Sequence, residues 1–141
     1  MTYIPAELHR LVTARAGYCC EYCHLSQDDA SFTFHIEHVI AEKHGGKTTA
    51  DNLCLSCPEC NTFKGSDIAS LDDLGGIPTL SLLYNPRTQR WSDHFRLDGV
   101  SIEPLTPEGR VTVRILQMNR PEAVAERELF SRLGTYPCHL P

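Results

Sequence analysis

Two histidines and a glutamate stand within the five-residue stretch "HIEHV" at positions 35–39. Ile36 and Val39 favour a strand, and burying ionisable side chains there costs free energy unless something binds them. A carboxylate oxygen suits a hard, partly hydrated cation such as magnesium, and a histidine beside such a cation can act as a general base on water. The stretch therefore predicts hydrolytic chemistry assisted by a divalent cation.

Two asparagines are expected to complete this constellation. Asn52 opens the next apolar segment, and Asn61 follows a cysteine pair. A strand, a glycine loop, a second strand and a helix would bring them together with Glu37 and His38. Adjacent residues of a strand point to opposite faces, so Glu37 and His38 converge only where the strand ends or bulges, and we predict such a distortion there.

The cysteines predict a second, separate metal site. Cys20 with Cys23 and Cys57 with Cys60 form two Cys-x-x-Cys pairs. A two-residue spacer lets both sulfurs of a pair reach one metal ion on a tight turn, and two pairs complete a tetrahedral site. We expect structural zinc, because a closed four-thiolate site leaves no position open for a substrate.

Three further cysteines compete for this assignment. Cys54 and Cys57 are also spaced as Cys-x-x-Cys, and Cys19 adjoins Cys20, so either could replace an expected ligand. We expect Cys54 to be a small buried apolar residue, and Cys19 and Cys138 to be reduced and not to bind the metal. The competing interpretations are four unliganded thiols or a redox pair, although a redox pair needs only one Cys-x-x-Cys.

The elements that must position these residues follow from apolar periodicity and from turn and cap residues. We expect helices at 5–17, 58–71 and 119–133, the last with Asn119 as N-cap, strands at 32–41 and 52–56, a turn-rich loop at 43–51, a loop at 72–78, a hairpin around Asp98-Gly99, and a segment at 106–119 that favours helix over strand.

Composition sets the broad class. The 141 residues carry a formal charge of −5, 41% are hydrophobic and 22% are charged, which is ordinary for a soluble globular chain. The first residues lack the apolar region of a signal peptide, so we expect a cytoplasmic protein whose cysteines serve metal rather than disulfides. The negative charge argues against a polyanion partner, although a bound cation and a local basic cluster can present a positive face.

The ordered set Cys20-x-x-Cys23, "HIEHV", "HGG", "NL", "CPECN" and Lys64 resembles the HNH endonucleases with their ββα-metal fold. The resemblance covers residues 20–65 closely. It implies an α+β fold with a ββα-metal core stapled by a four-cysteine zinc site, an N-terminal helix, and a C-terminal hairpin plus helices. We expect one HNH nuclease domain over residues 1–141, with its core at 18–70 and a C-terminal extension at 80–135.

The resemblance also implies roles for individual residues. Glu37 falls where the family has a metal ligand, and His38 at the general base that activates water. Asn52 falls at the position that pins the loop, and Asn61 at a final ligand of the catalytic cation. Asparagine at position 61 favours Mg²⁺ or Mn²⁺ over zinc or nickel. Glutamate at position 37, in place of the commoner aspartate, leaves direct and water-mediated ligation open.

The implied substrate is nucleic acid, with DNA preferred over RNA. The side chains expected to hold phosphates are Lys43, Lys47, Lys64, Arg87 and Arg90, with Arg96 nearby. We expect Trp91 to pack under the hairpin, His35 to be a partly buried structural histidine, and His44 to be exposed. No base-reading element is apparent, so specificity is low or comes from a homodimer or a partner protein.

The rival function is a zinc-stapled module that binds nucleic acid or protein without cleaving it. The cysteines fit both functions equally well. Glu37, His38 and Asn61 separate them, because a binding module has no physical reason to carry this set.

Overall fold

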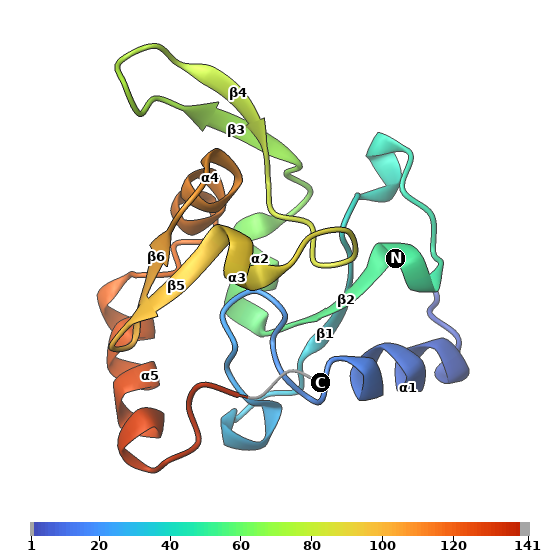
Figure 1. The fold of residues 1–141 in the computed structure, drawn as a ribbon. Coiled ribbons are helices and arrows are strands. Elements are labelled where there is room, and N and C mark those ends of the chain that lie inside the picture. Colours follow the sequence, from blue (N-terminus) through green and yellow to red (C-terminus); the bar gives the residue numbers. More distant parts are fainter. Residues whose placement is uncertain (1, 139–141) are drawn as a thin grey trace.

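Two short antiparallel strands and the helix after them build the part of the fold that carries the predicted chemistry (Figure 1). These elements are β1 (His35–His38), β2 (Leu53–Ser56) and α2 (Pro58–Lys64), within a computed structural model that describes residues 2–138. Proline at the first helical position is preorganised for a helix start. The expected α+β class with its ββα core is confirmed.

Strand β1 is shorter than the predicted 32–41, because other groups take its backbone bonds at both ends. The Phe34 amide donates to Gln27 Oε1 at 3.0 Å, and beyond His38 the Ile40 amide donates to the side chain of Asn52. The register pairs Glu37 with Cys54 and His38 with Leu53 in an unbroken ladder. These pairs contain no bulge, and His38 lies at the end of the strand, which is the other of the two possibilities predicted there.

Helix α1 (Ala6–Arg15) packs against this sheet and confirms the predicted first helix. It ends at Arg15, two residues before Gly17, whose φ of 61° is the left-handed conformation that glycine adopts readily. At its last turn Arg15 donates to the carbonyls of Ala50 and Leu53 at 2.9 and 2.7 Å. The helix is thus tied to the loop that precedes β2.

The predicted helix 58–71 is wrong beyond Lys64. Gly65, with φ 53°, ends α2, and the chain continues into a hairpin of β3 (Ala69–Asp72) and β4 (Thr79–Leu82). The predicted loop at 72–78 is the connection of this hairpin, which projects from the body in Figure 1. The pairing partner lies ten residues further along the chain, so local helical periodicity could not report it.

The C-terminal half follows the prediction more closely. Strands β5 (Phe95–Asp98) and β6 (Ser101–Pro104) form the hairpin expected around Asp98-Gly99, after a one-turn helix α3 (Trp91–His94) that was not predicted. Helices α4 (Pro107–Ile115) and α5 (Pro121–Arg132) follow. Helix α5 is capped by Arg120 without a side-chain bond, because Asn119 instead bonds the backbone of Ile102.

The buried core joins both halves of the chain. Tyr22, Leu55, Phe95, Ile102 and Leu116 belong to one apolar cluster and are all 1% exposed or less. Among the described residues, none of the helices is long and apolar enough to cross a membrane.

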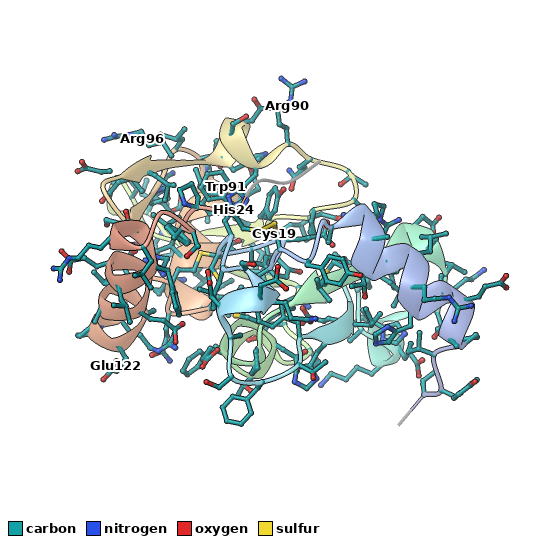
Figure 2. The ribbon with its side chains drawn as sticks, turned by 90° about the horizontal axis from the view of Figure 1, so that it is seen from below. Cys19, His24, Arg90, Trp91, Arg96 and Glu122 are labelled. Atoms are coloured by element: carbon teal, nitrogen blue, oxygen red, sulfur yellow. A yellow bond between two sulfur atoms is a disulfide. The ribbon has the colours of Figure 1, made fainter. Side chains whose placement is uncertain are left out.

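A disulfide corrects the expectation that all cysteines are reduced. Cys19 and Cys138 are bonded, with their Cα atoms 5.8 Å apart and a sequence separation of 119 (Figure 2). The two are indeed not ligands of the predicted zinc cluster. The bond returns the C-terminal segment to the turn that carries the first Cys-x-x-Cys pair, a proximity that spacing along the chain does not reveal.

Candidate metal and catalytic sites

The sulfurs of Cys20, Cys23, Cys57 and Cys60 lie within 4.8 Å of one another, and all four residues are buried. Cys23 Sγ and Cys57 Sγ are 3.8 Å apart. Thiolates about 2.3 Å from a central zinc ion in a tetrahedron would lie about 3.8 Å from each other. The four expected residues therefore fit structural zinc, and Cys54 lies outside the cluster.

The electrostatics of the cluster also favour a cation. Hydrogen bonding to the Cys20 sulfur is the main cause that raises the pKa of the Cys57 and Cys60 thiols. A divalent ion is what allows four crowded, buried sulfurs to be thiolates at once.

Backbone contacts hold both cysteine turns in place. Cys57 is the N-cap of α2, and its Sγ accepts from the Cys60 amide at 3.4 Å. The first turn is held by the C-terminal segment, because the Tyr136 hydroxyl donates to the Cys23 carbonyl at 2.7 Å and the Cys138 amide to the His24 carbonyl at 2.9 Å. The disulfide therefore closes a segment that already contacts the metal-binding turn.

Glu37, His38 and Asn61 line one cavity of about 550 Å³, together with residues of the N-terminal segment. Glu37 and His38 come from the end of β1, and Asn61 from the first turns of α2. The structure thus brings together the three residues that the sequence singled out, whereas Asn52 lies beside them in the supporting loop. His35 also borders this cavity, but it is exposed rather than partly buried.

Glu37 is buried, and its Oε1 is held by an ion pair rather than by a hydrogen bond. The residue is 6% exposed, Oε1 accepts no hydrogen bond, and Lys64 Nζ lies 3.4 Å from this atom. Burial raises the pKa of Glu37 to about 7, against the opposing effect of Lys64. A buried carboxylate that shares a cavity with an amide side chain fits a hard divalent cation.

Lys64 differs from the expected surface contact to phosphate. Its side chain is 1% exposed, and its Nζ lies 3.4 Å from Glu37 Oε1 and 3.4 Å from the His38 carbonyl. The ammonium group therefore faces the cavity residues from inside the protein. The sequence offered no signal for this, because lysine on a short helix is ordinarily exposed.

His38 is held by a hydrogen-bond chain that selects its tautomer. Its Nε2 lies 2.8 Å from Thr48 Oγ1, and that hydroxyl donates to Glu42 Oε1 at 3.1 Å. Because the only hydroxyl proton of Thr48 is directed to Glu42, Nε2 of His38 must be the donor in the first bond. In the neutral ring the lone pair is then on Nδ1. Thr48 and Glu42 were not predicted, since they lie in a loop with no motif of its own.

Asn52 closes this loop. Its Oδ1 accepts from the Ile40 amide, and its Nδ2 donates to the carbonyls of Ile40 and Lys47, all three at 2.9 Å. Gly46 lies so close that a Cβ there would be 1.7 Å from the Ile40 carbonyl oxygen and 2.8 Å from Asn52 Nδ2. Only glycine fits, so the "HGG" and "NL" segments together set the path of the chain that carries Thr48.

The expected basic contacts divide into exposed and engaged side chains. Lys43, Lys47 and Arg90 are exposed, and Figure 2 shows Arg90 and Arg96 pointing outward. Arg87 is ion-paired to Glu21 and is only partly exposed.

Trp91 packs against Phe95 at the start of the hairpin, with ring centroids 5.1 Å apart, and also against the first cysteine turn. It donates from Nε1 to the Tyr22 carbonyl at 2.8 Å and lies against His24, with ring centroids 4.1 Å apart. The expectation for His44 is met, since it is exposed in the glycine loop.

Residues 20–67 match a family model described as HNH endonuclease. Searches of curated proteins and of solved structures give no match. The matched segment contains the four-cysteine cluster, both strands β1 and β2, and helix α2. An HNH domain indicates a nuclease or nucleic-acid-binding function. Residues 20–67 of the protein therefore match the HNH endonuclease family, and their four-cysteine cluster fits its zinc-bound members.

Proposed function

We propose that this protein is a metal-dependent endonuclease that hydrolyses the phosphodiester bonds of DNA. The observation that carries the proposal is the shared cavity of Glu37, His38 and Asn61, which lies within the segment matching the HNH family. A binding module has no need of a buried carboxylate, an oriented imidazole and an amide around one space.

His38 is the general base of this proposal. With Nε2 donating to Thr48, the lone pair on Nδ1 removes a proton from a water molecule, whose oxygen then attacks the phosphorus. Thr48 and Glu42 position the ring and stabilise the imidazolium that forms, because Glu42 Oε1 lies 3.4 Å from Nε2. Asn52 acts further away, by holding the loop that carries Thr48.

Glu37 and Asn61 are the proposed holders of Mg²⁺ or Mn²⁺. When bound, such an ion supplies positive charge for the phosphate and for the departing 3′-oxygen. Lys64 lies beside Glu37 and positions its carboxylate. The exposed Lys43, Lys47 and Arg90 would contact backbone phosphates, which positions a substrate without reading its sequence.

Supercoiled plasmid tests this function directly. The purified, zinc-loaded protein should nick plasmid with magnesium or manganese and stop when the divalent ion is removed. His38→Ala should abolish nicking, whereas His44→Ala, a histidine exposed in the same loop region, should cut like the native protein. Each variant is first checked for zinc content and for its thermal unfolding profile.

The possible results separate the two candidate functions. Binding to DNA without cleavage of duplex, single strands or RNA by the native protein would support the zinc-stapled binding module instead. Equal cutting by the native protein and His38→Ala would remove His38 from the proposed role.

A further inference from the structure

The β3–β4 hairpin has one polar and one apolar face. Its register pairs Leu71 with Leu80 and Ala69 with Leu82, and alternation along each strand places these four on the same side. The three leucines are 53%, 70% and 64% exposed in chain order. At the tip, Leu74 and Ile77 are 69% and 77% exposed.

The body of the protein holds this hairpin by its polar face. Arg110 of α4 makes two 2.9 Å hydrogen bonds to the Asp72 carboxylate, and Arg114 donates to Ser70 Oγ at 2.9 Å. A two-layer packing ordinarily buries the apolar face of a sheet and leaves the polar face in water. Here the arrangement is reversed, so the apolar face is left without a partner among the described residues.

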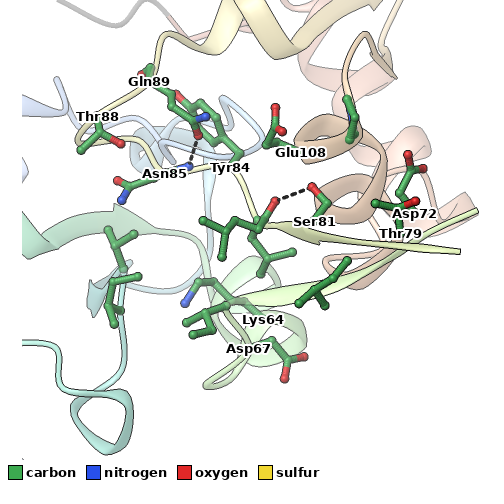
Figure 3. A pocket seen from close by; sticks show the side chains of 17 residues that line it. Lys64, Asp67, Asp72, Thr79, Ser81, Tyr84, Asn85, Thr88, Gln89 and Glu108 are labelled. Carbon is green, nitrogen blue, oxygen red and sulfur yellow. Dashed lines mark hydrogen bonds between the residues drawn. The ribbon is translucent and has the colours of Figure 1, made fainter.

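This face borders a cavity of about 550 Å³ beside β4 (Figure 3). Leu80 and Leu82 line it from the hairpin, and Val39, Ile40 and Ile68 line it from the HNH core. The apolar hairpin face adjoins this cavity at Leu80 and Leu82, and we call the two together the hairpin groove. The rest of the cavity wall is mixed and includes Lys64, Asp67, Asp72 and Glu108. The hairpin groove reaches the residues that directly follow His38.

Charge argues against nucleic acid as the occupant of the hairpin groove. Residues 65–86 contain no lysine or arginine and three aspartates, and Lys64 in the cavity wall is buried in an ion pair with Glu37. Phosphates would be repelled there, and the apolar face itself offers no charged group to a charged peptide.

Area and symmetry favour a second copy of the chain. The exposed leucines and isoleucine present on the order of 600 Å² of surface, at the upper limit for monomers and close to the ~800 Å² that one partner contributes to a standard interface. Homodimer interfaces are the more apolar class. An isolated two-stranded hairpin is also marginal, and a symmetric pair would complete a larger sheet or a two-layer packing.

We propose that the hairpin groove is the interface of a homodimer, in which the same hairpin of a second copy covers it. The inference is independent of catalysis, because it rests on the apolar face, the cavity and the charges of residues 65–86.

Sedimentation equilibrium of the full, zinc-loaded chain across the micromolar range tests the interface. The native protein should sediment at twice the chain mass of 15.8 kDa. Leu80→Glu combined with Leu82→Glu should lower the mass twofold. Leu133→Glu, a 66% exposed leucine at the end of α5, should leave the dimer intact and controls for added charge.

A second variant guards against loss of folding. Leu74→Glu lies at the tip, outside both strands, so it cannot disturb their ladder, and it should also give monomers. A native protein that is monomeric throughout the range, or a dimer that survives all hairpin variants, would overturn the proposal. A native monomer whose affinity for DNA falls in Leu74→Glu would overturn it as well and assign the hairpin to nucleic acid.

Discussion

The side chain of Asn52 holds the loop that carries Thr48, so Asn52→Asp tests how much this loop contributes to stability and to the site. The substitution is nearly isosteric and keeps the acceptor for the Ile40 amide, but it replaces the donor that bonds two carbonyls at 2.9 Å. Two net hydrogen bonds are worth about 1 kcal/mol each, and a carboxylate oxygen facing two carbonyl oxygens adds repulsion. We expect a loss of about 2–4 kcal/mol in the free energy of unfolding.

Urea unfolding followed by Trp91 fluorescence measures this loss, and plasmid nicking under folding conditions measures its effect at the site. The loop opens before the core unfolds, so nicking should fall even where the variant is folded. An unfolding free energy within about 0.5 kcal/mol of the native value would refute the reasoning, because it lies in the range of ordinary surface substitutions.

Asn119→Asp is the matched control. Asn119 makes the same pair of bonds to a single isoleucine, accepting from the Ile102 amide at 2.9 Å and donating to its carbonyl at 2.8 Å. It also accepts from Arg127, which an aspartate would bind more strongly. This variant should lose less stability and nick at the native rate while folded. Equal loss of nicking in both variants would show that general destabilisation, not the loop, explains the result.

Two further predictions concern the zinc site and the disulfide. The purified chain should hold one zinc ion, and stripping it with a chelator should unfold the protein, because a structural zinc contributes ~10–16 kcal/mol, as much as the whole stability of a small domain; a protein that keeps its circular dichroism without zinc would contradict this. Cys138→Ser should lower the free energy of unfolding by up to about 4 kcal/mol, because the bond closes a loop with a sequence separation of 119. A phosphine reductant should bring the native protein to the same value and leave the variant unchanged, and a native protein that is insensitive to it would contradict the prediction.

Local spacing predicted the metal cluster and the central elements correctly. Two Cys-x-x-Cys pairs specify their own turns, and Pro58 after a cysteine specifies a helix start that carries the second pair. A residue is easiest to predict from sequence when its structural role depends only on neighbours a few positions away. The family resemblance placed Asn52 at the position that pins the loop, and the fold shows that it does so through the backbone of Ile40.

Contacts between distant segments were not predictable in the same way. The disulfide of Cys19 needs a residue from the far end of the chain, and β3 needs the strand that follows the tip of the hairpin. The segment after Lys64 has helical periodicity, but Gly65 breaks it and pairing with β4 outweighs what propensity remains. Long-range pairing decides such ambiguous segments because local propensity differs by less than the free energy of a formed ladder.

Lys64 and the two asparagines share one lesson about polar residues. Lysine is ordinarily solvated and asparagine ordinarily caps or turns, and we expected Lys64 at the surface and Asn119 as an N-cap for these reasons. In the structure Lys64 is buried against Glu37, and Asn52 and Asn119 each bind both backbone groups of one isoleucine in another element. A buried polar side chain must find partners, and in a small core those partners are backbone groups or opposite charges from elsewhere in the chain. The polar residues that depart from their common local role are therefore ones that join elements distant in the sequence.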